Sequence, residues 1–385
     1  MSDSVPDTDS PTVRHVLDPR NWSIRHRLGI VGLFALALLP FQLSTLDLLK
    51  ATGALYLAVF VMSWDFVSGY TGQMSFGHTF FFAIGGYTSA LLNLGHGVDP
   101  LLSIPAGVAL AALSGFIIGA PALRLQGPYL ALITLTAPLI LLRIFVMFSD
   151  IFGGDKGLPS PATLVEFDDF VQTVDANYYL AFAVFLFVLG VTYAITRSDH
   201  GTVFTAIRED QEAVAASGIN PAKFKIFAFV TSAALGGLGG AVFVHTPVGN
   251  ASPSQLLDLA VMIEILIAAI FGGLGTIVGP AIGGLFLYTL RDWIGQQEWM
   301  VPVLDMPVTR LDLLLFYTLT LFFLFFLPSG LVPWSIDRGR QVIGRFGGNR
   351  PNVAADGGAS PLEQIRDRYR EEIHELTDDD RGDDR

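Results

Sequence analysis

The sequence predicts an all-α fold, a polytopic transmembrane bundle of about ten helices, some of them broken by glycine or proline. Of the 385 residues, 51% are hydrophobic and only 15% are charged, whereas soluble domains carry roughly 25% charged residues. Long stretches such as Leu28–Leu46 and Pro100–Leu123 contain no Asp, Glu, Lys or Arg. A helix that spans a bilayer needs about 20 mainly apolar residues, so these stretches exclude a soluble fold.

Seven crossings can be read directly from the apolar stretches. They cover about 28–46, 51–68, 78–94, 101–123, 127–148, 177–196 and 224–245. The next apolar region, 257–290, is too long for one simple span and is interrupted by GGLGTIVGP. We expect two short helices hinged at Gly272–Gly275; a single tilted helix and a re-entrant pair are the alternatives.

Small residues spaced four apart favour close helix packing where no hydrophobic effect drives association. Such pairs are Gly115 with Gly119, Gly236 with Gly240, and Gly279 with Gly283.

Charged residues predict the orientation, because lysine and arginine mark cytoplasmic loops. Basic residues precede the first crossing and lie between the sixth and seventh, whereas the loop Ser149–Ala176 is acidic. With 257–290 counted as two crossings, both termini are cytoplasmic. The expected organisation is a cytoplasmic leader (1–27), a transmembrane domain (28–336) containing a cytoplasmic loop (197–223), and an acidic, largely disordered cytoplasmic tail (337–385).

The net charge of −12 is unevenly distributed, since Pro351–Arg385 holds 11 acidic residues against 5 arginines. Surface acidity of this kind fits a halophile with a salty cytoplasm, and equally an ordinary solvated tail. The chain has no cysteine, which excludes disulfides, thiolate metal sites and a cysteine nucleophile.

A glycine-rich polar segment, GYTGQMSFGH, stands between two apolar stretches and is not expected to be helical. Broken backbone at membrane depth is tolerated where protein or a water-filled cavity satisfies it, and in transporters such breaks line the substrate route. A tight turn at the membrane surface is the alternative. The candidate pathway residues here are Gly69, Thr71, Gly72, Gln73, Ser75, Gly77 and His78.

Two acidic residues, Asp65 and Glu264, fall inside apolar stretches. A charge at the bilayer centre costs about 2.5–3.5 kcal/mol on insertion scales, so neither side chain should face lipid. Glu264 is a further candidate pathway residue, although a structural pair with a polar group on a neighbouring helix is the favoured interpretation.

The loop AIREDQEAVAASGINPAKFK predicts a short helix over Asp210–Ser217, stopped by Gly218. Its alanines form a face that fits the groove of a cytoplasmic partner, and an ordinary surface helix is the alternative. The candidate partner-binding residues are Arg208, Glu209, Asp210, Glu212, Ala213 and Gly218. The chain has no phosphate-loop motif and no histidine spacing typical of metal ligands.

Two segments resemble the permease family of branched-chain amino-acid ABC transporters. GYTGQMSFGHTFFFAIGGYTSALL is similar to the family's GYxGQxSxGHxxFxxIGAYxxALL signature, and IEILIAAIFGGLGTIVGPAIGG follows the loop in the family's order and spacing. The resemblance covers roughly 54–290. Asp65 stands where the family usually has asparagine, and Ala228 replaces an isoleucine of the general permease motif.

This resemblance implies a transport subunit rather than an enzyme, with the loop helix coupling it to an ATPase. It further implies a sister permease, two ATP-binding-cassette ATPase subunits that hold ATP and Mg²⁺, an extracellular solute-binding protein, and surrounding membrane lipid. No nucleic-acid partner and no cofactor in this chain are expected. Urea or short-amide permeases share nearly the same signature, and a self-contained secondary transporter or channel is the rival from another class.

Overall fold

The computed structural model describes residues 24–122, 128–297, 300–301, 306–307, 311–327, 330–336 and 338. Two units divide the chain, 1–334 and 335–385, and the description below concerns the first. The expected leader (1–27), apart from residues 24–27, and the expected acidic tail (337–385), apart from Arg338, lie outside the described residues.

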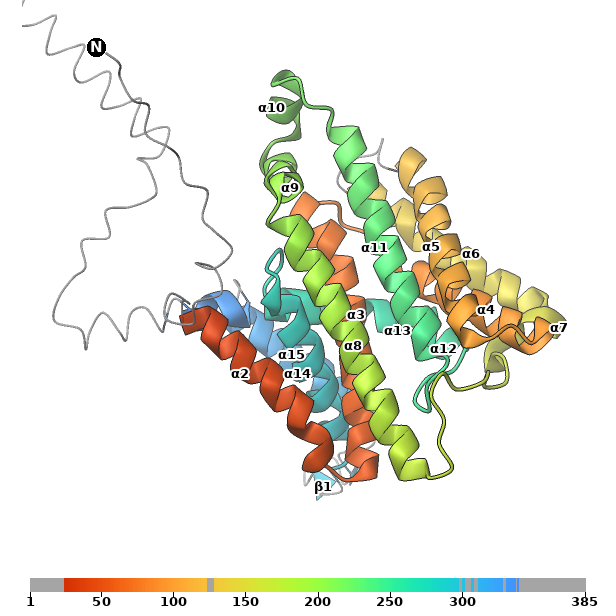
Figure 1. The fold of residues 1–385 in the computed structure, drawn as a ribbon. Coiled ribbons are helices and arrows are strands. Elements are labelled where there is room, and N and C mark those ends of the chain that lie inside the picture. Colours follow the sequence, from red (N-terminus) through yellow and green to blue (C-terminus); the bar gives the residue numbers. More distant parts are fainter. Residues whose placement is uncertain are drawn as a thin grey trace, which may run out of the picture. The chain divides into compact units, whose positions relative to one another are not determined.

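Helices make up most of the described chain, so the predicted helical bundle is confirmed (Figure 1). The first half contains α2 (Ile24–Leu38), η2 (Leu39–Phe41), α3 (Thr45–Thr71), α4 (His78–His96), α5 (Pro100–Ala122), α6 (Pro128–Met147), α7 (Ser149–Phe152) and η3 (Gly154–Lys156). The second half contains α8 (Phe170–Thr196), α9 (Asp199–Glu209), α10 (Gln211–Ala216), α11 (Pro221–Phe243), α12 (Pro253–Leu256), α13 (Leu259–Gly272), α14 (Val278–Gly295) and α15 (Asp312–Phe326). Strands β1 (Met300–Val301) and β2 (Met306–Pro307) pair antiparallel.

Within the described residues, six helical segments are long and apolar enough to cross a membrane. They are Thr45–Thr71, Pro100–Pro121, Tyr129–Met147, Phe170–Thr196, Pro221–Phe243 and Pro253–Gly272. Shorter apolar helices lie at Gly29–Phe41 and Asp312–Phe323. The expected number of about ten therefore includes helices, such as α4 and α14, that fall outside these six.

Several helix boundaries differ from those expected, for local reasons. The hydroxyl of Ser44 accepts a hydrogen bond from the amide of Asp47 and caps α3, which therefore begins at Thr45 instead of 51. Asp169 caps α8 in the same way, so this helix begins at Phe170 instead of 177. The first crossing was expected to reach residue 46, but α2 ends at Leu38 because Pro40 continues it only as a 3₁₀ turn.

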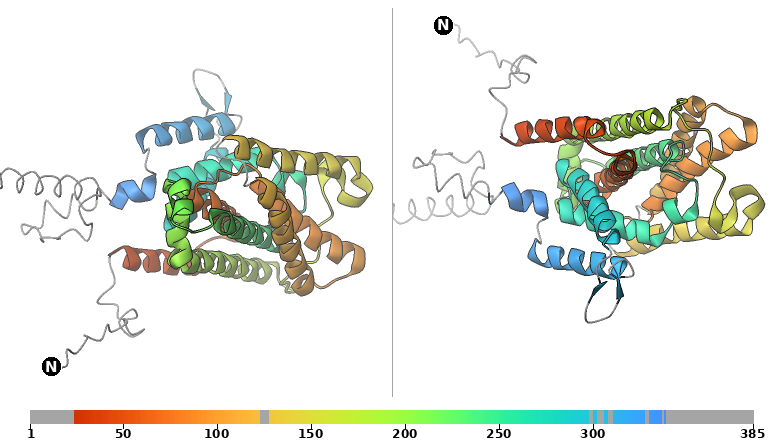
Figure 2. Two further views of the ribbon diagram at one scale, coloured as in Figure 1. Left: turned by 90° about the horizontal axis from the view of Figure 1, so that it is seen from above. Right: turned by 90° about the horizontal axis from the view of Figure 1, so that it is seen from below.

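The centre of the bundle is formed by α3 and α11, which are buried more extensively than α5, α6 and α8 (Figure 2). α3 packs against α8, α11 and α14, while α11 also packs against α4 and α5. The expected glycine contacts occur: a side chain at Gly240 would meet the backbone of Phe82 in α4, and one at Gly115 in α5 would meet Ala233 in α11. These helices approach at backbone distance, as close packing in lipid requires.

The region 257–290 forms two antiparallel helices, α13 and α14, separated by Gly273–Ile277. This hinge agrees with the one expected at Gly272–Gly275. A side chain at Gly283 in α14 would meet the carbonyl of Ala268 in α13, so the two arms lie against each other along their length.

The first unit has two distinct ends (Figure 1). At one end, called the α10 end, lie α9, α10, the segment 72–77 and the hinge 273–277. At the other, called the β1 end, lie the strand β1 and the start of α8.

Replacing Gly240 by valine tests the backbone contact between α4 and α11. The added side chain must displace the carbonyl of Phe82, and overpacking of this kind typically costs about 1–3 kcal/mol or more. We expect a clear fall in the thermal unfolding midpoint of the detergent-solubilised protein. Gly190→Val on α8 is the matched control, because no atom lies within 4 Å of its added Cβ; equal midpoints for the two variants would contradict the packing argument.

Candidate functional site

The polar segment between α3 and α4 is shorter than the sequence suggested. Residues 69–78 were expected to be non-helical, but Gly69 and Thr71 belong to the last turn of α3 and His78 is the first residue of α4. The break is confined to 72–77. The hydroxyl of Thr71 donates to the carbonyl of Val67 at 2.7 Å, which lets a polar residue remain inside the helix.

Side chains of α3 hold this break segment in place. The indole nitrogen of Trp64 donates to the carbonyl of Ser75 at 2.6 Å. The hydroxyl of Ser68 donates to the carbonyl of Gln73 at 3.0 Å and accepts from the amide of Ser75 at 3.3 Å. From α6, Thr134 accepts a hydrogen bond from the amide of Phe76 at 3.1 Å. The irregular backbone is thus satisfied by protein, as burial at membrane depth demands.

His78 begins a buried hydrogen-bonded chain through the centre of the bundle. Ser232 of α11 donates its hydroxyl proton to the carbonyl of Ser63, so its oxygen must accept from Nε2 of His78, 2.5 Å away. The other ring nitrogen, Nδ1, then accepts from the hydroxyl of Ser75 at 3.4 Å. Both ring nitrogens are occupied, and the imidazole is fully buried.

Four residues from three distant parts of the chain meet at the α10 end. Asp65 Oδ1 accepts the amide proton of Gly275 at 3.0 Å, and Arg208 donates from Nη1 to the carbonyl of Gly69 at 2.9 Å. Gly275 has a left-handed φ of 66°, and a Cβ there would lie 2.5 Å from Arg208 Nη1. Only glycine fits this position. We call Asp65, Gly69, Arg208 and Gly275 the hinge cluster.

The short helix expected at Asp210–Ser217 forms over Gln211–Ala216. Asp210 caps it by accepting from the amides of Glu212 and Ala213 at 2.9 and 3.0 Å. Lys225 of α11 donates to Gln211 at 2.9 Å and anchors the helix on its inner side.

The outward face of α10 carries Glu212 and Ala213, which are exposed, and Gly218 follows with a positive φ. Glu209 pairs with Arg208 at 3.3 Å. The candidate partner-binding residues therefore lie together at the α10 end, although Arg208 also turns inward to the hinge cluster.

Glu264 does not join the other candidate pathway residues. It lies on α13 and forms an ion pair with Arg291 of α14, so its carboxylate is committed to a neighbouring helix. The remaining candidates, from Gly69 to His78, are grouped around the break segment.

A second buried histidine lies at the β1 end, just beyond α11. His245 Nδ1 donates to the carbonyl of Ala162 at 2.6 Å, so Nε2 accepts from the hydroxyl of Ser89 at 2.8 Å. Ser89 in turn contacts Ser103 of α5 at 2.8 Å. Burial lowers the pKa of His245, and the bond to Ala162 opposes this only in part.

Within the described ranges, no three His, Asp or Glu side chains are grouped so that they could hold a metal ion. The sequence predicted Arg208 only as a partner-binding residue and did not identify Ser232 or Gly275 as partners. The available signals were a serine inside an otherwise apolar, glycine-rich helix and the glycine-rich run that follows α13.

The long apolar helices and their antiparallel packing define a multi-pass membrane protein. A family described as "Branched-chain amino acid transport system / permease component" matches residues 48–324. Because this match covers most of the chain, the protein belongs to that family.

Individual relatives agree with the family match. The chain is 29% identical over 296 residues to the high-affinity branched-chain amino acid transport system permease protein LivM of Escherichia coli (strain K12). This alignment covers 70% of this chain and 69% of that protein. The chain is 25% identical to the probable branched-chain amino acid transport permease protein LivM of Methanocaldococcus jannaschii, over 66% of this chain and 78% of that protein. It is also 25% identical to the fructose import permease protein FrcC of Rhizobium meliloti, over 53% and 59%. No solved structure matches this chain.

Substitution of Asp65 separates the hydrogen bond of the hinge cluster from the buried charge. Asp65→Asn keeps an acceptor oxygen for Gly275 and removes the charge, so we expect an unfolding midpoint at least equal to that of the unmodified protein. Asp65→Leu leaves the Gly275 amide unpaired, which costs about 1–3 kcal/mol. Thermal unfolding in detergent distinguishes them; an equal loss in both variants would mean that the charge itself is required.

His245 makes stability depend on pH. Because its pKa is lowered in the folded protein, the unfolded chain, with a histidine pKa of about 6.5, takes up this proton first as the pH falls. The stability that neutral, buried His245 contributes to the folded protein is present above about pH 6.5 and is lost as the pH falls below it. We expect His245→Gln to reduce the fall in unfolding midpoint between about pH 7.5 and pH 5.5, whereas exposed His96→Gln leaves it unchanged; identical profiles would refute the assignment.

Proposed function

We propose that this chain is a membrane-spanning permease subunit of an ATP-binding-cassette importer. Its solutes are leucine, isoleucine and valine, delivered by an extracellular solute-binding protein, and a separate ATPase supplies the energy. The observation that carries this proposal is the family match over residues 48–324. The capped helix α10, which presents exposed Glu212 and Ala213, adds a surface suited to an ATPase partner.

The α10 end is then cytoplasmic and the β1 end faces outward. Basic residues at the α10 end, among them Arg197 and Arg208, support this orientation, as does the acidic loop between α6 and α8. Both termini are cytoplasmic in this arrangement, with the leader 1–27 and the tail 337–385 on the same side. The chain works beside a sister permease and two ATPase subunits, which hold ATP and Mg²⁺, within membrane lipid.

The contacts of α10 describe how movement of an ATPase reaches the membrane helices. Lys225 connects α10 to α11 through Gln211 at 2.9 Å. Arg208, in the last turn of α9 and two residues before the Asp210 cap, reaches the last turn of α3 through the carbonyl of Gly69. A displacement of α10 therefore pulls on both central helices. Alternating access follows when such packed elements shift between two arrangements, and no residue of this chain carries out bond chemistry.

Sugars are the second candidate class of solute. The likeness to a fructose import permease at 25% identity favours this alternative, because the same fold serves a neutral polar solute there. Urea or short amides remain a further alternative from the signature shared around the break segment.

Uptake of labelled leucine by cells with and without this chain tests the solute class. We expect uptake that depends on the chain and is abolished by excess unlabelled valine, but not by urea or fructose. Chain-dependent uptake of urea or fructose, with leucine uptake unchanged, would overturn the proposed solute and leave the fold and family intact.

The same cells test the ATPase partner. Glu212→Arg reverses a charge on the exposed face of α10, and Gly218→Trp places a bulky side chain at a glycine with a φ of 89° that faces open space. We expect both variants to lose co-purification with the ATPase and at least tenfold in leucine uptake. Gly190→Val, remote from this face, serves as the control; retained co-purification in both variants would contradict the docking role.

A further inference from the structure

One face of α6 carries three polar side chains, interspersed with leucines, that no described part of the chain covers. Tyr129, Leu132, Thr136, Leu139 and Arg143 are spaced three and four residues apart, so they form a single stripe along the helix. All five are exposed. We call them the α6 stripe.

Arg143 lies within the apolar span Tyr129–Met147. Its guanidinium forms no hydrogen bond or ion pair with any residue that the structure describes. Helical side chains lean towards the N-terminus of their helix, so Arg143 leans towards the middle of the span and away from the nearer end at Met147. Exposing an arginine to hydrocarbon is costly, and charged residues within spans commonly face a water-filled solute pathway.

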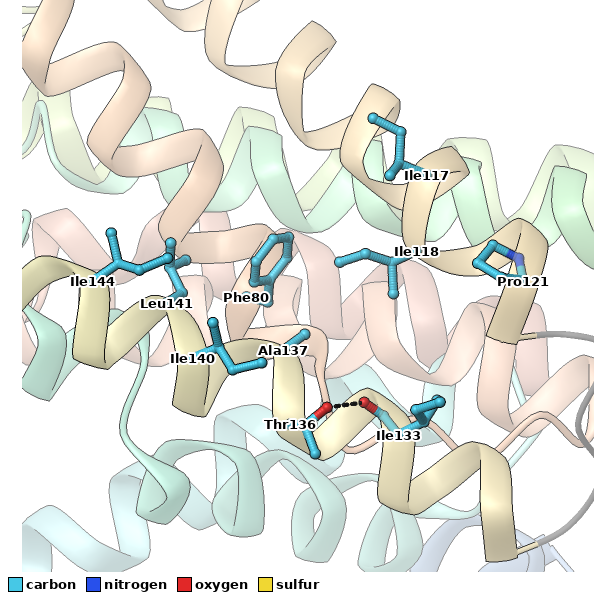
Figure 3. Close-up of a pocket in the computed structure, with 10 residues that line it drawn as sticks. All are labelled: Phe80, Ile117, Ile118, Pro121, Ile133, Thr136, Ala137, Ile140, Leu141 and Ile144. Carbon is cyan, nitrogen blue, oxygen red and sulfur yellow. Dashed lines mark hydrogen bonds between the residues drawn. The ribbon is translucent and has the colours of Figure 1, made fainter.

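An apolar cavity of about 440 Å³ lies directly beside the stripe, between α5 and α6. The cavity is lined by Ile117 and Ile118 of α5 and by Ile140 and Ile144 of α6, and Figure 3 shows Phe80 of α4 between these two helices. Its volume falls within the range of roughly 300–1,000 Å³ typical of ligand sites. Ile140 and Ile144 flank Arg143 in the sequence, so α6 carries both part of the cavity lining and the guanidinium.

The other ionisable candidates in the membrane region already have partners. Glu264 is paired with Arg291, Asp65 is bound to the Gly275 amide, and both ring nitrogens of His78 are occupied. Arg143 is therefore the charged group best placed to meet a solute.

From this juxtaposition we infer that the α6 stripe lines the solute pathway, with Arg143 binding the carboxylate of an amino acid whose apolar side chain enters the α5–α6 cavity. A guanidinium offers donors in a planar fork that matches a carboxylate, and the isoleucines accept a branched aliphatic group. The inference rests on the proposed function for the identity of the solute.

The absence of native cysteine makes a labelling test direct. Thr136→Cys is introduced into the complete transporter, co-expressed with its sister permease, ATPases and binding protein, and treated in membranes with hydrophilic anionic and cationic thiol reagents. We expect the anionic reagent to react several-fold faster, leucine to slow the reaction, and Arg143→Gln to abolish the anionic preference. Phe187→Cys, at an exposed apolar position on α8, is the control and should remain unreactive.

Transport of labelled leucine provides the second measurement. Arg143→Gln should lower uptake at least tenfold with unchanged membrane levels and ATPase co-purification, while Arg143→Lys, which keeps a cation, should retain part of it. Unchanged uptake in Arg143→Gln overturns the inference. The inference is also overturned if the Thr136→Cys variant is inert, reacts equally with both reagents or is unaffected by leucine. These results are expected if Arg143 is directed to the outer lipid headgroups, or if the sister permease seals the stripe.

The two proposals fail in different ways. An unmodified transporter that imports urea or fructose but no leucine overturns the proposed solute, and the assignment of a carboxylate to Arg143 with it. If the transporter imports leucine but gives any of the overturning outcomes above, only the inference about α6 is refuted and the proposed function stands.

Discussion

The arrangement of this bundle depends on satisfying the polar groups that α3 carries into its interior. Water cannot reach Ser63, Trp64 or Asp65, which are almost fully buried, so each must find a partner within the protein. Ser63 offers its carbonyl to α11, Trp64 binds the break segment, and Asp65 binds the hinge between α13 and α14. One helix thereby fixes the positions of three segments, two of which, α11 and the hinge, are remote from it in sequence.

Close backbone contact makes these bonds geometrically feasible. Because Gly240 brings α11 to backbone distance from α4, the short hydroxyl of Ser232 can reach both His78 and the carbonyl of Ser63. A larger residue at the contact would separate α11 from α4 and break the bond between Ser232 and His78. Glycine packing and hydrogen bonding therefore act together. The close approach of the helices, which the glycines permit, sets the distance that the polar side chains must span.

The helices could be predicted from the sequence better than the contacts between them. Charge-free stretches predicted the helical bundle, and GGLGTIVGP predicted the hinge, because apolar length and glycine content are local properties. The start of α3 was missed, since Ser44 acts through a cap that an apolar stretch does not register. The hinge cluster joins Asp65, Arg208 and Gly275 across long separations, and nothing local in the sequence says that an arginine next to an exposed helix turns inward.

The hinge cluster also limits how this protein can change during evolution. Gly69 and Gly275 are so close that a side chain on either would enter the space of the other or of its neighbours, so neither can vary alone. Position 65 is more permissive, because aspartate and asparagine present the same acceptor oxygen to the Gly275 amide. Exchange of aspartate for asparagine at position 65 would therefore keep this geometry, whereas a side chain at Gly69 or Gly275 would disrupt it.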